Sequence, residues 1–190
     1  MSMVSAGDFK NGLTFEMNGS VMQVIEFQHV KPGKGSAFVR TKFKNLITGA
    51  ILEKSFNPNE KFPLAYIEKK NVQFSYSDGD LKNFLDLESY EFISVDESKL
   101  GDGFKFIKEE MKLKMLFYNG KVLGVELPNF VELEVVESEP GVKGNTATNA
   151  TKPVTLSTGA QIRVPLFVHE GNVVRIDTRT GEYIERISSN

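Results

Sequence analysis

A lysine placed among turn-forming residues is the part of this sequence best suited to do chemistry. The segment reads Lys31-Pro32-Gly33-Lys34-Gly35 and lies between two runs of strand-forming residues, 21–28 and 37–44. Proline fixes φ at about −65° and donates no hydrogen bond to a β-ladder, whereas glycine accepts positive φ. We therefore predict a β-hairpin whose tip holds Lys34 away from the body of the protein. A turn without further function is the alternative, since these residue types favour turns by themselves.

Basic residues surround this predicted tip. No aspartate or glutamate occurs between Glu26 and Glu53, an interval that holds Lys31, Lys34, Arg40, Lys42 and Lys44. Alternate residues of a strand point to the same face, so positions 40, 42 and 44 should share one face and positions 39, 41 and 43 the other. A lysine tip continued by three cations on one strand face predicts a surface for a polyanion.

Further motifs follow along the chain in order. They occupy residues 27–40, 45–49, 127–128, 139–144 and 159–168, and end with Asp177-Thr178-Arg179-Thr180-Gly181-Glu182-Tyr183. In type and spacing these motifs resemble the bacterial elongation factor P family over the whole chain. Ser36, at a variable position, and the three N-terminal residues 1–3 are the visible departures.

The resemblance implies an all-β protein of three small β-barrels arranged as an L. The first would be an SH3-like (KOW-like) barrel and the next two OB-fold barrels. Two proline-containing breaks, 56–63 and 127–129, place the expected domains at 1–64, 65–128 and 129–190. The residues themselves indicate short strands and turns, with Asn18-Gly19 and Asn119-Gly120 as two-residue hairpin turns. We also predict one helix over 104–111 and a long loop over 137–152.

The resemblance also implies a function in translation. Members of the family bind the ribosome between the peptidyl and exit sites, contact the CCA end of peptidyl-tRNA and relieve stalling at consecutive prolines. Lys34 would then be the tip residue, which the family commonly extends by covalent modification, in a loop shaped by Lys31, Pro32, Gly33 and Gly35. Arg40, Lys42 and Lys44 become candidate contacts to RNA phosphates.

Two residues near the C-terminus are further candidates. Tyr183 could stack on RNA and Arg186 could pair with its phosphates, in the barrel that the family directs toward the small ribosomal subunit. A strand-edge tyrosine and a solvated arginine are the alternative interpretation.

The charge distribution agrees with one directed RNA surface. The chain of 190 residues has a net charge of −2, divided as +3 in residues 1–65, −3 in 66–129 and −2 in 130–190. A second lysine turn, in residues 140–144, lies among acids and is interpreted as a plain loop. The expected partners are both ribosomal subunits with their RNA, peptidyl-tRNA and a lysine-modifying enzyme.

Several classes of function find no support in the sequence. The chain lacks cysteine and has two histidines, which excludes disulfides and thiolate metal sites. No catalytic signature is present, so we expect no enzyme, no cofactor and no metal. No apolar run approaches the roughly 20 residues that span a bilayer, so we expect a cytoplasmic monomer without a membrane partner. A divergent paralogue of the family and a general single-stranded RNA-binding module remain the alternatives.

Overall fold

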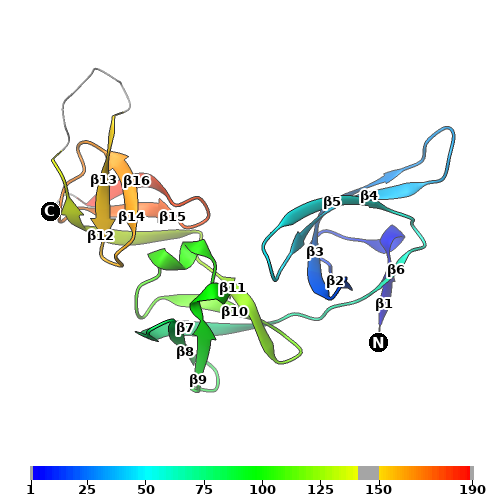
Figure 1. Ribbon diagram of the computed structural model, residues 1–190, viewed down its shortest axis with the longest axis horizontal. Helices are drawn as coiled ribbons and strands as arrows, with labels where there is room; N and C mark the ends of the chain where they lie inside the picture. Colours follow the sequence, from blue (N-terminus) through cyan, green and yellow to red (C-terminus); the bar gives the residue numbers. More distant parts are fainter. Residues whose placement is uncertain (1, 141–149, 189–190) are drawn as a thin grey trace. The chain divides into compact units, whose positions relative to one another are not determined.

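Tight turns join short strands through almost all of the chain (Figure 1). The computed structural model describes residues 2–140 and 150–188, and these contain sixteen strands and three short 3-10 helices. Two compact units are present. Unit 1 contains Met1–Lys69 with Leu116–Gly124, and unit 2 contains Lys70–Met115 with Val125–Asn190.

Unit 1 is built on a four-stranded antiparallel sheet in the order β2-β3-β4-β5. Its strands are β2 (Thr14–Met17), β3 (Ser20–Val30), β4 (Phe38–Asn45) and β5 (Ile51–Phe56). A second, two-stranded sheet pairs β1 (Met3–Ser5) with β6 (Lys61–Pro63), and the 3-10 helix η1 (Ala6–Asp8) follows β1. Five buried phenylalanine rings fill the space inside, with neighbouring centroids 4.9 to 6.1 Å apart: Phe9, Phe15, Phe43, Phe56 and Phe62.

Two further five-stranded sheets follow along the chain, and Figure 1 shows both of them curled. The first has the order β11-β10-β7-β8-β9, with β7 (Glu68–Asp78), β8 (Leu81–Asp86), β9 (Phe92–Asp96), β10 (Lys112–Tyr118) and β11 (Lys121–Glu126). The second has the order β14-β13-β12-β15-β16, with β12 (Phe130–Ser138), β13 (Thr151–Leu156), β14 (Gln161–Pro165), β15 (Val173–Asp177) and β16 (Glu182–Ser188). The 3-10 helices η2 (Glu97–Lys99) and η3 (Asp102–Phe106) lie between β9 and β10.

Both predicted two-residue hairpin turns are confirmed. Asn18 and Gly19 have φ of 52° and 75°, and Asn119 and Gly120 have φ of 50° and 76°. Positive φ at both central residues is the signature of the type I′ turn, whose twist matches that of the flanking strands. These turns join β2 to β3 and β10 to β11.

The helix predicted over 104–111 is wrong. Only the 3-10 helix η3 forms there, and it ends before Ile107. The N–H of Glu110 donates to the carbonyl of Phe74 at 2.8 Å, and the N–H of Phe74 donates to the carbonyl of Met111 at 2.9 Å. This pairing with β7 takes the backbone groups that an α-helix would need, and Glu110 adopts a positive φ of 73°.

The predicted breaks need smaller corrections. β5 ends at Phe56 as expected, but Lys61–Pro63 forms β6, a short edge strand in which proline is tolerated. No strand covers 127–129, as predicted. The ends of the expected loop 137–152 lie inside β12 and β13, while residues 141–149, with most of the second lysine turn, lie outside the described residues. The domain boundaries at 64 and 128 stay predictions.

One hairpin turn occurs three times, once in each large sheet. It begins at Asn45, Asp86 and Asp177, and each side-chain oxygen accepts the N–H two residues on, at 2.8, 2.9 and 2.9 Å. Each backbone carbonyl accepts the N–H four residues on, at 2.7, 2.8 and 2.7 Å. The pKa of Asp86 is lowered chiefly by the N–H of Glu88, and the pKa of Asp177 chiefly by the Arg179 side chain. The fifth residue has positive φ in all three turns, and is Gly49, Tyr90 and Gly181.

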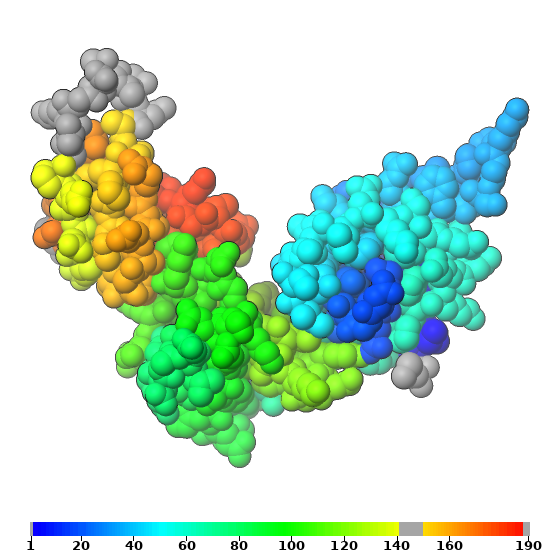
Figure 2. All heavy atoms as spheres, viewed as in Figure 1, coloured from blue at the N-terminus to red at the C-terminus, as the bar shows by residue number. Residues whose placement is uncertain are grey.

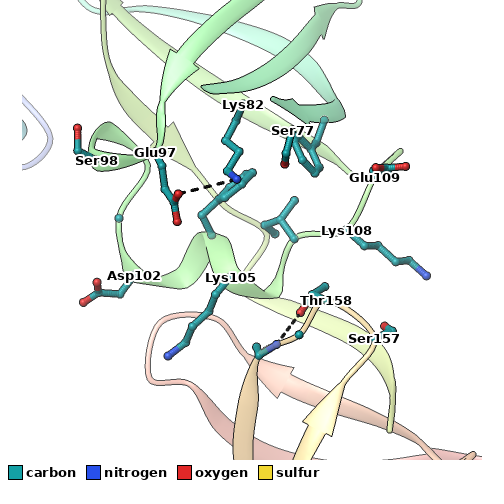
Figure 3. A pocket seen from close by; sticks show the side chains of 16 residues that line it. Ser77, Lys82, Glu97, Ser98, Asp102, Lys105, Lys108, Glu109, Ser157 and Thr158 are labelled. Atoms are coloured by element: carbon teal, nitrogen blue, oxygen red, sulfur yellow. Dashed lines mark hydrogen bonds and ion pairs between the residues drawn. The ribbon is translucent and has the colours of Figure 1, made fainter. Parts of the chain in front are cut away.

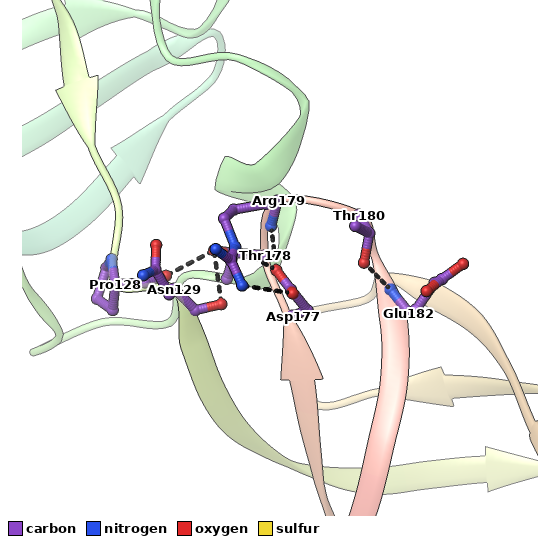
Figure 4. A network of polar contacts seen from close by, with 7 residues as sticks. All are labelled: Pro128, Asn129, Asp177, Thr178, Arg179, Thr180 and Glu182. Atoms are coloured by element: carbon purple, nitrogen blue, oxygen red, sulfur yellow. Dashed lines mark hydrogen bonds and ion pairs between the residues drawn. The ribbon is translucent and has the colours of Figure 1, made fainter. Parts of the chain in front are cut away.

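The third of these turns also packs closely inside unit 2 (Figure 4). The Thr178 hydroxyl donates to the carbonyl of Pro128 at 2.5 Å, and its N–H donates to the carbonyl of Asn129 at 2.9 Å. A Cβ at Gly103, in η3, would lie 2.7 Å from the carbonyl oxygen of Thr178. Only glycine allows this approach. The motif at 177–183 therefore has a structural function in joining η3 to β15.

Gly103→Ala should destabilise unit 2, because the new methyl group would meet backbone that cannot move aside cheaply. We expect a loss of about 1–3 kcal/mol, seen as a lower denaturant midpoint by circular dichroism. Gly33→Ala is the matched control, since its Cβ would meet no atom within 4 Å. Equal midpoints for the two variants would show that η3 and the Thr178 turn do not pack this closely in solution.

Acid should destabilise the protein through the aspartate turns. The lowered pKa of Asp177 means that the folded state binds fewer protons than the unfolded state in the acid range. Its contribution is therefore present above about pH 4 and is lost as pH falls through the lowered pKa. Asp177→Asn should lose less thermal stability than the unchanged protein between about pH 5 and pH 2. Parallel melting curves across this range would contradict the expectation.

Candidate RNA interface at the lysine hairpin

The predicted lysine hairpin is present and extends beyond the core of unit 1. β3 and β4 pair from Met22↔Asn45 to Val30↔Phe38, and the connecting residues 31–37 belong to no strand. Beyond Val24, β3 contains no buried residue, and every residue of the loop is exposed. Figure 2 shows the end of this hairpin as a thin, light-blue projection from unit 1.

The two glycines of the loop differ in what they do. Gly35 has φ of 104°, a conformation in which a side chain is strained, so glycine is required there. Gly33 has no positive φ, and a Cβ on it would meet nothing within 4 Å. Among the residues that the structure describes, Lys34 makes no hydrogen bond or ion pair. The tip is therefore a narrow loop that leaves the Lys34 ammonium group open to a partner.

The alternation predicted for β4 is confirmed, and the register adds a correction. Val39, Thr41 and Phe43 are buried, whereas the cations between them are exposed or half-buried. Lys42 lies directly opposite Glu26 on β3 and Glu53 on β5. Directly opposed residues have Cβ atoms roughly 4.5–5.5 Å apart, so these carboxylates screen the Lys42 charge.

Arg40 and Lys44 have no such carboxylate neighbours. Arg40 is paired with Gln28 and Ser55, and Lys44 is paired with Gln23 and Ile51. Glu26 and Glu53 are the acids that bound the acid-free interval of the sequence. In the fold these two residues lie on either side of Lys42, the middle cation of β4. The basic surface thus consists of two separated cations and the lysine tip.

The C-terminal candidates lie on β16 and differ in exposure. Tyr183 is half-buried, and burial raises its pKa. The exposed Arg186 guanidinium lies 5.0 Å from the ring centroid of Phe167 and donates a hydrogen bond of 3.5 Å to the Phe167 carbonyl. Phe167 was not predicted from the sequence. It is 57 % exposed, which makes it better suited than the half-buried Tyr183 to stack on a base. The structure does not bring this group together with Lys34 in one unit.

Sequence reasoning also missed a cleft of about 910 Å³ in unit 2 (Figure 3). Its charged lining residues are Lys82, Lys105, Lys108, Glu97, Asp102 and Glu109. Lys82 and Glu97 form an ion pair at 3.8 Å, and the remaining charges balance in number. The cleft therefore offers no net attraction for an anion such as RNA.

Metal chemistry finds no support in residues 2–140 and 150–188, where no group of three or more His, Asp or Glu side chains could hold an ion. None of the helices in the same residues has the length and apolar composition needed to cross a membrane.

The fold and the hairpin define an all-β protein of small curled sheets, one of which extends into a projecting lysine loop. Sequence models of three domains match in succession: "Elongation factor P (EF-P) KOW-like domain" over 5–62, "Elongation factor P (EF-P) OB domain" over 67–125 and "Elongation factor P, C-terminal" over 131–186. The predicted fold class, a KOW-like barrel followed by OB-fold barrels, is confirmed.

Curated relatives are similar over nearly the whole chain. Elongation factor P of Acetivibrio thermocellus is 60% identical, and that of Ruminiclostridium cellulolyticum is 57% identical; each match covers 97% of this chain and 100% of the relative. The chain belongs to the elongation factor P family and is a translation elongation factor.

Solved structures with the same fold are more distant in sequence. Translation initiation factor 5A from Methanococcus jannaschii is 20% identical with a TM-score of 0.52, over 66% of this chain and 94% of that one. An initiation factor 5A family protein from Naegleria fowleri is 15% identical with a TM-score of 0.54, over 66% and 96%. At this identity the likeness shows a shared fold over two thirds of the chain.

The two loop glycines should respond differently to alanine. Gly35→Ala places a side chain at φ of 104° and should weaken the hairpin end by about 1 kcal/mol, a factor of roughly five in local opening. Gly33→Ala should change it little. Hydrogen exchange of the amides of Val30 and Phe38 measures the difference, and equal exchange in both variants would contradict the assigned loop backbone.

Proposed function

We propose that this elongation factor binds the ribosome between the peptidyl and exit sites. Its Lys34 loop contacts the CCA end of peptidyl-tRNA, and this contact stimulates peptide-bond formation and relieves stalling at consecutive prolines. The observation that carries the proposal is the exposed, unpaired Lys34 at the end of a projecting hairpin, in a chain of this family.

The chemistry asked of Lys34 is positional and electrostatic. Proline reacts slowly because its ring restricts both φ and the attacking amine. A factor that holds the CCA end and its peptidyl ester in attack geometry lowers the entropic part of the barrier without proton transfer. An ammonium group on a flexible stem suits a phosphate-rich site, and the absence of a side chain at Gly33 keeps the probe narrow.

The same exposure supports covalent modification of Lys34. A lysine without an intramolecular partner is open to a modifying enzyme, and an added group would lengthen the probe beyond the loop formed by residues 31–35. Arg40 and Lys44 are the favoured phosphate contacts, with Lys42 secondary. Arg186, held against the exposed Phe167 ring, supports a small-subunit contact near Tyr183. We further propose the domains 1–64, 65–128 and 129–190, acting as a monomer.

Reconstituted translation of a reporter with three consecutive prolines tests the proposed function. Adding the protein should relieve the stall, and Lys34→Ala should abolish relief while the circular dichroism spectrum stays unchanged. Relief only with protein from its native source would indicate that Lys34 must be modified. If relief persists in Lys34→Ala, the proposed role of Lys34 is wrong. Ribosome binding without any relief would favour a divergent paralogue.

Salt dependence separates the three cations of β4. Arg40→Ala and Lys44→Ala should each reduce the slope of log K against log salt by about 0.7–1, because each removes one phosphate contact. Lys42→Ala is the matched control and should change the slope by less than half as much, since Glu26 and Glu53 screen it. Affinity for ribosomes measured over a salt series checks this. Equal changes for all three variants would show that the strand register does not select the contacts.

A further inference from the structure

Aromatic side chains are exposed together on the outer side of β7–β9. Tyr76 is 49 % and Phe92 61 % exposed, yet their rings contact each other edge to face with centroids 6.3 Å apart. Tyr90 is 73 % exposed and lies in the turn that leads into β9. The inner side of the same sheet buries Val72, Phe74 and Phe84, so the outer aromatics are not needed for that core.

Tyr90 occupies a position where the chain otherwise uses glycine. In the three equivalent turns the fifth residue is Gly49, Tyr90 and Gly181, with φ of 79°, 60° and 76°. A bulky residue is disfavoured in this conformation. Among the described residues, Tyr90 makes no side-chain hydrogen bond and no ring contact that would offset the strain. The tyrosine is therefore unfavourable for the backbone of this turn, and no side-chain contact within the described residues compensates for it.

Carboxylates border this aromatic surface at both ends. Glu88 and Glu91 lie on either side of Tyr90 and are exposed. Asp78 is the last residue of β7, and Asp80 lies in the turn before β8. None of these four carboxylates forms an ion pair within the described part of the chain. Lys70 pairs with Asp86 at 3.9 Å. Lys82 pairs with Glu97 at 3.8 Å and also donates to the Gly79 carbonyl at 3.4 Å, so one ammonium lies near the Asp78 and Asp80 end of the border. The border of the surface is thus negative.

We propose that Tyr76, Tyr90 and Phe92 form a docking surface for a basic segment of a protein on the ribosome. Tyrosine and phenylalanine are enriched in protein interfaces. Aromatic faces bind arginine and lysine through cation–π contacts, and the bordering carboxylates complement the same cations. RNA also stacks on aromatic rings, but the four carboxylates outnumber the one ammonium of Lys82 at the border and would repel its phosphates. The surface shares no residue with the Lys34 hairpin. The choice of a ribosomal protein as its partner rests on the ribosome binding proposed above.

Tyr90→Gly separates docking from folding. It restores the residue of the two sister turns, so the thermal midpoint should stay equal or rise, while affinity for purified ribosomes carrying peptidyl-tRNA should fall about tenfold, as for the loss of an interface hot spot. Tyr66→Gly is the matched control, because Tyr66 is 71 % exposed and lies outside this surface. It should leave the affinity unchanged.

The double variant Glu88→Lys with Glu91→Lys decides the class of partner. A basic protein segment predicts weaker binding to the same ribosomes, by tenfold or more. Tighter binding would overturn the proposal in favour of RNA, and unchanged binding in this variant and in Tyr90→Gly would show that the surface docks nothing there. Failure of the unchanged protein to bind ribosomes would instead overturn the proposed function, and with it this partner.

Discussion

The phenylalanine cluster of unit 1 is the interaction on which the lysine hairpin depends. Phe43 and Val39 are buried on β4, and Phe43 contacts Phe15 and Phe56 at 6.1 and 6.0 Å between ring centroids. No residue in the outer half of β3 is fully buried, and its half-buried Phe27 packs against this same core. Packing at the base of β4, with the β3–β4 hydrogen bonds, therefore has to hold the projecting arm and the tip it carries.

Local features of the fold were readable from the sequence, and non-local ones were not. Asn18-Gly19 and Asn119-Gly120 set their turns by themselves, because their φ preferences decide the geometry. The apolar spacing at 104–111 was ambiguous, since Phe104 and Ile107 are buried in a 3-10 turn and an extended segment as readily as in a helix. The hydrogen bond between Phe74 and Met111 selects the extended conformation over the helix. This contact joins residues distant in the sequence, so a local pattern cannot predict it.

The candidate site divides in the same way. The hairpin, its exposed Lys34 and the alternation along β4 follow from residue types in one continuous stretch. The screening of Lys42 depends on strand register, which brings Glu26 and Glu53 beside it from 16 and 11 residues away. The unusual backbone of Tyr90 could not be predicted from the sequence for a related reason. Its positive φ becomes evident only when the turns at Asn45, Asp86 and Asp177 are found to share one geometry.

The gap at the centre of the basic strand has a geometric consequence. Arg40 and Lys44 are four positions apart on the strand, which is about 13 Å at 3.3 Å per residue. Under the proposed function, a polyanion lying along β4 would meet a cation at each of these two points, with Lys42 and its two opposed carboxylates between them. Under the proposed function, phosphates at this spacing would match the two cations, which makes the shape of a folded nucleic acid part of what the strand recognises.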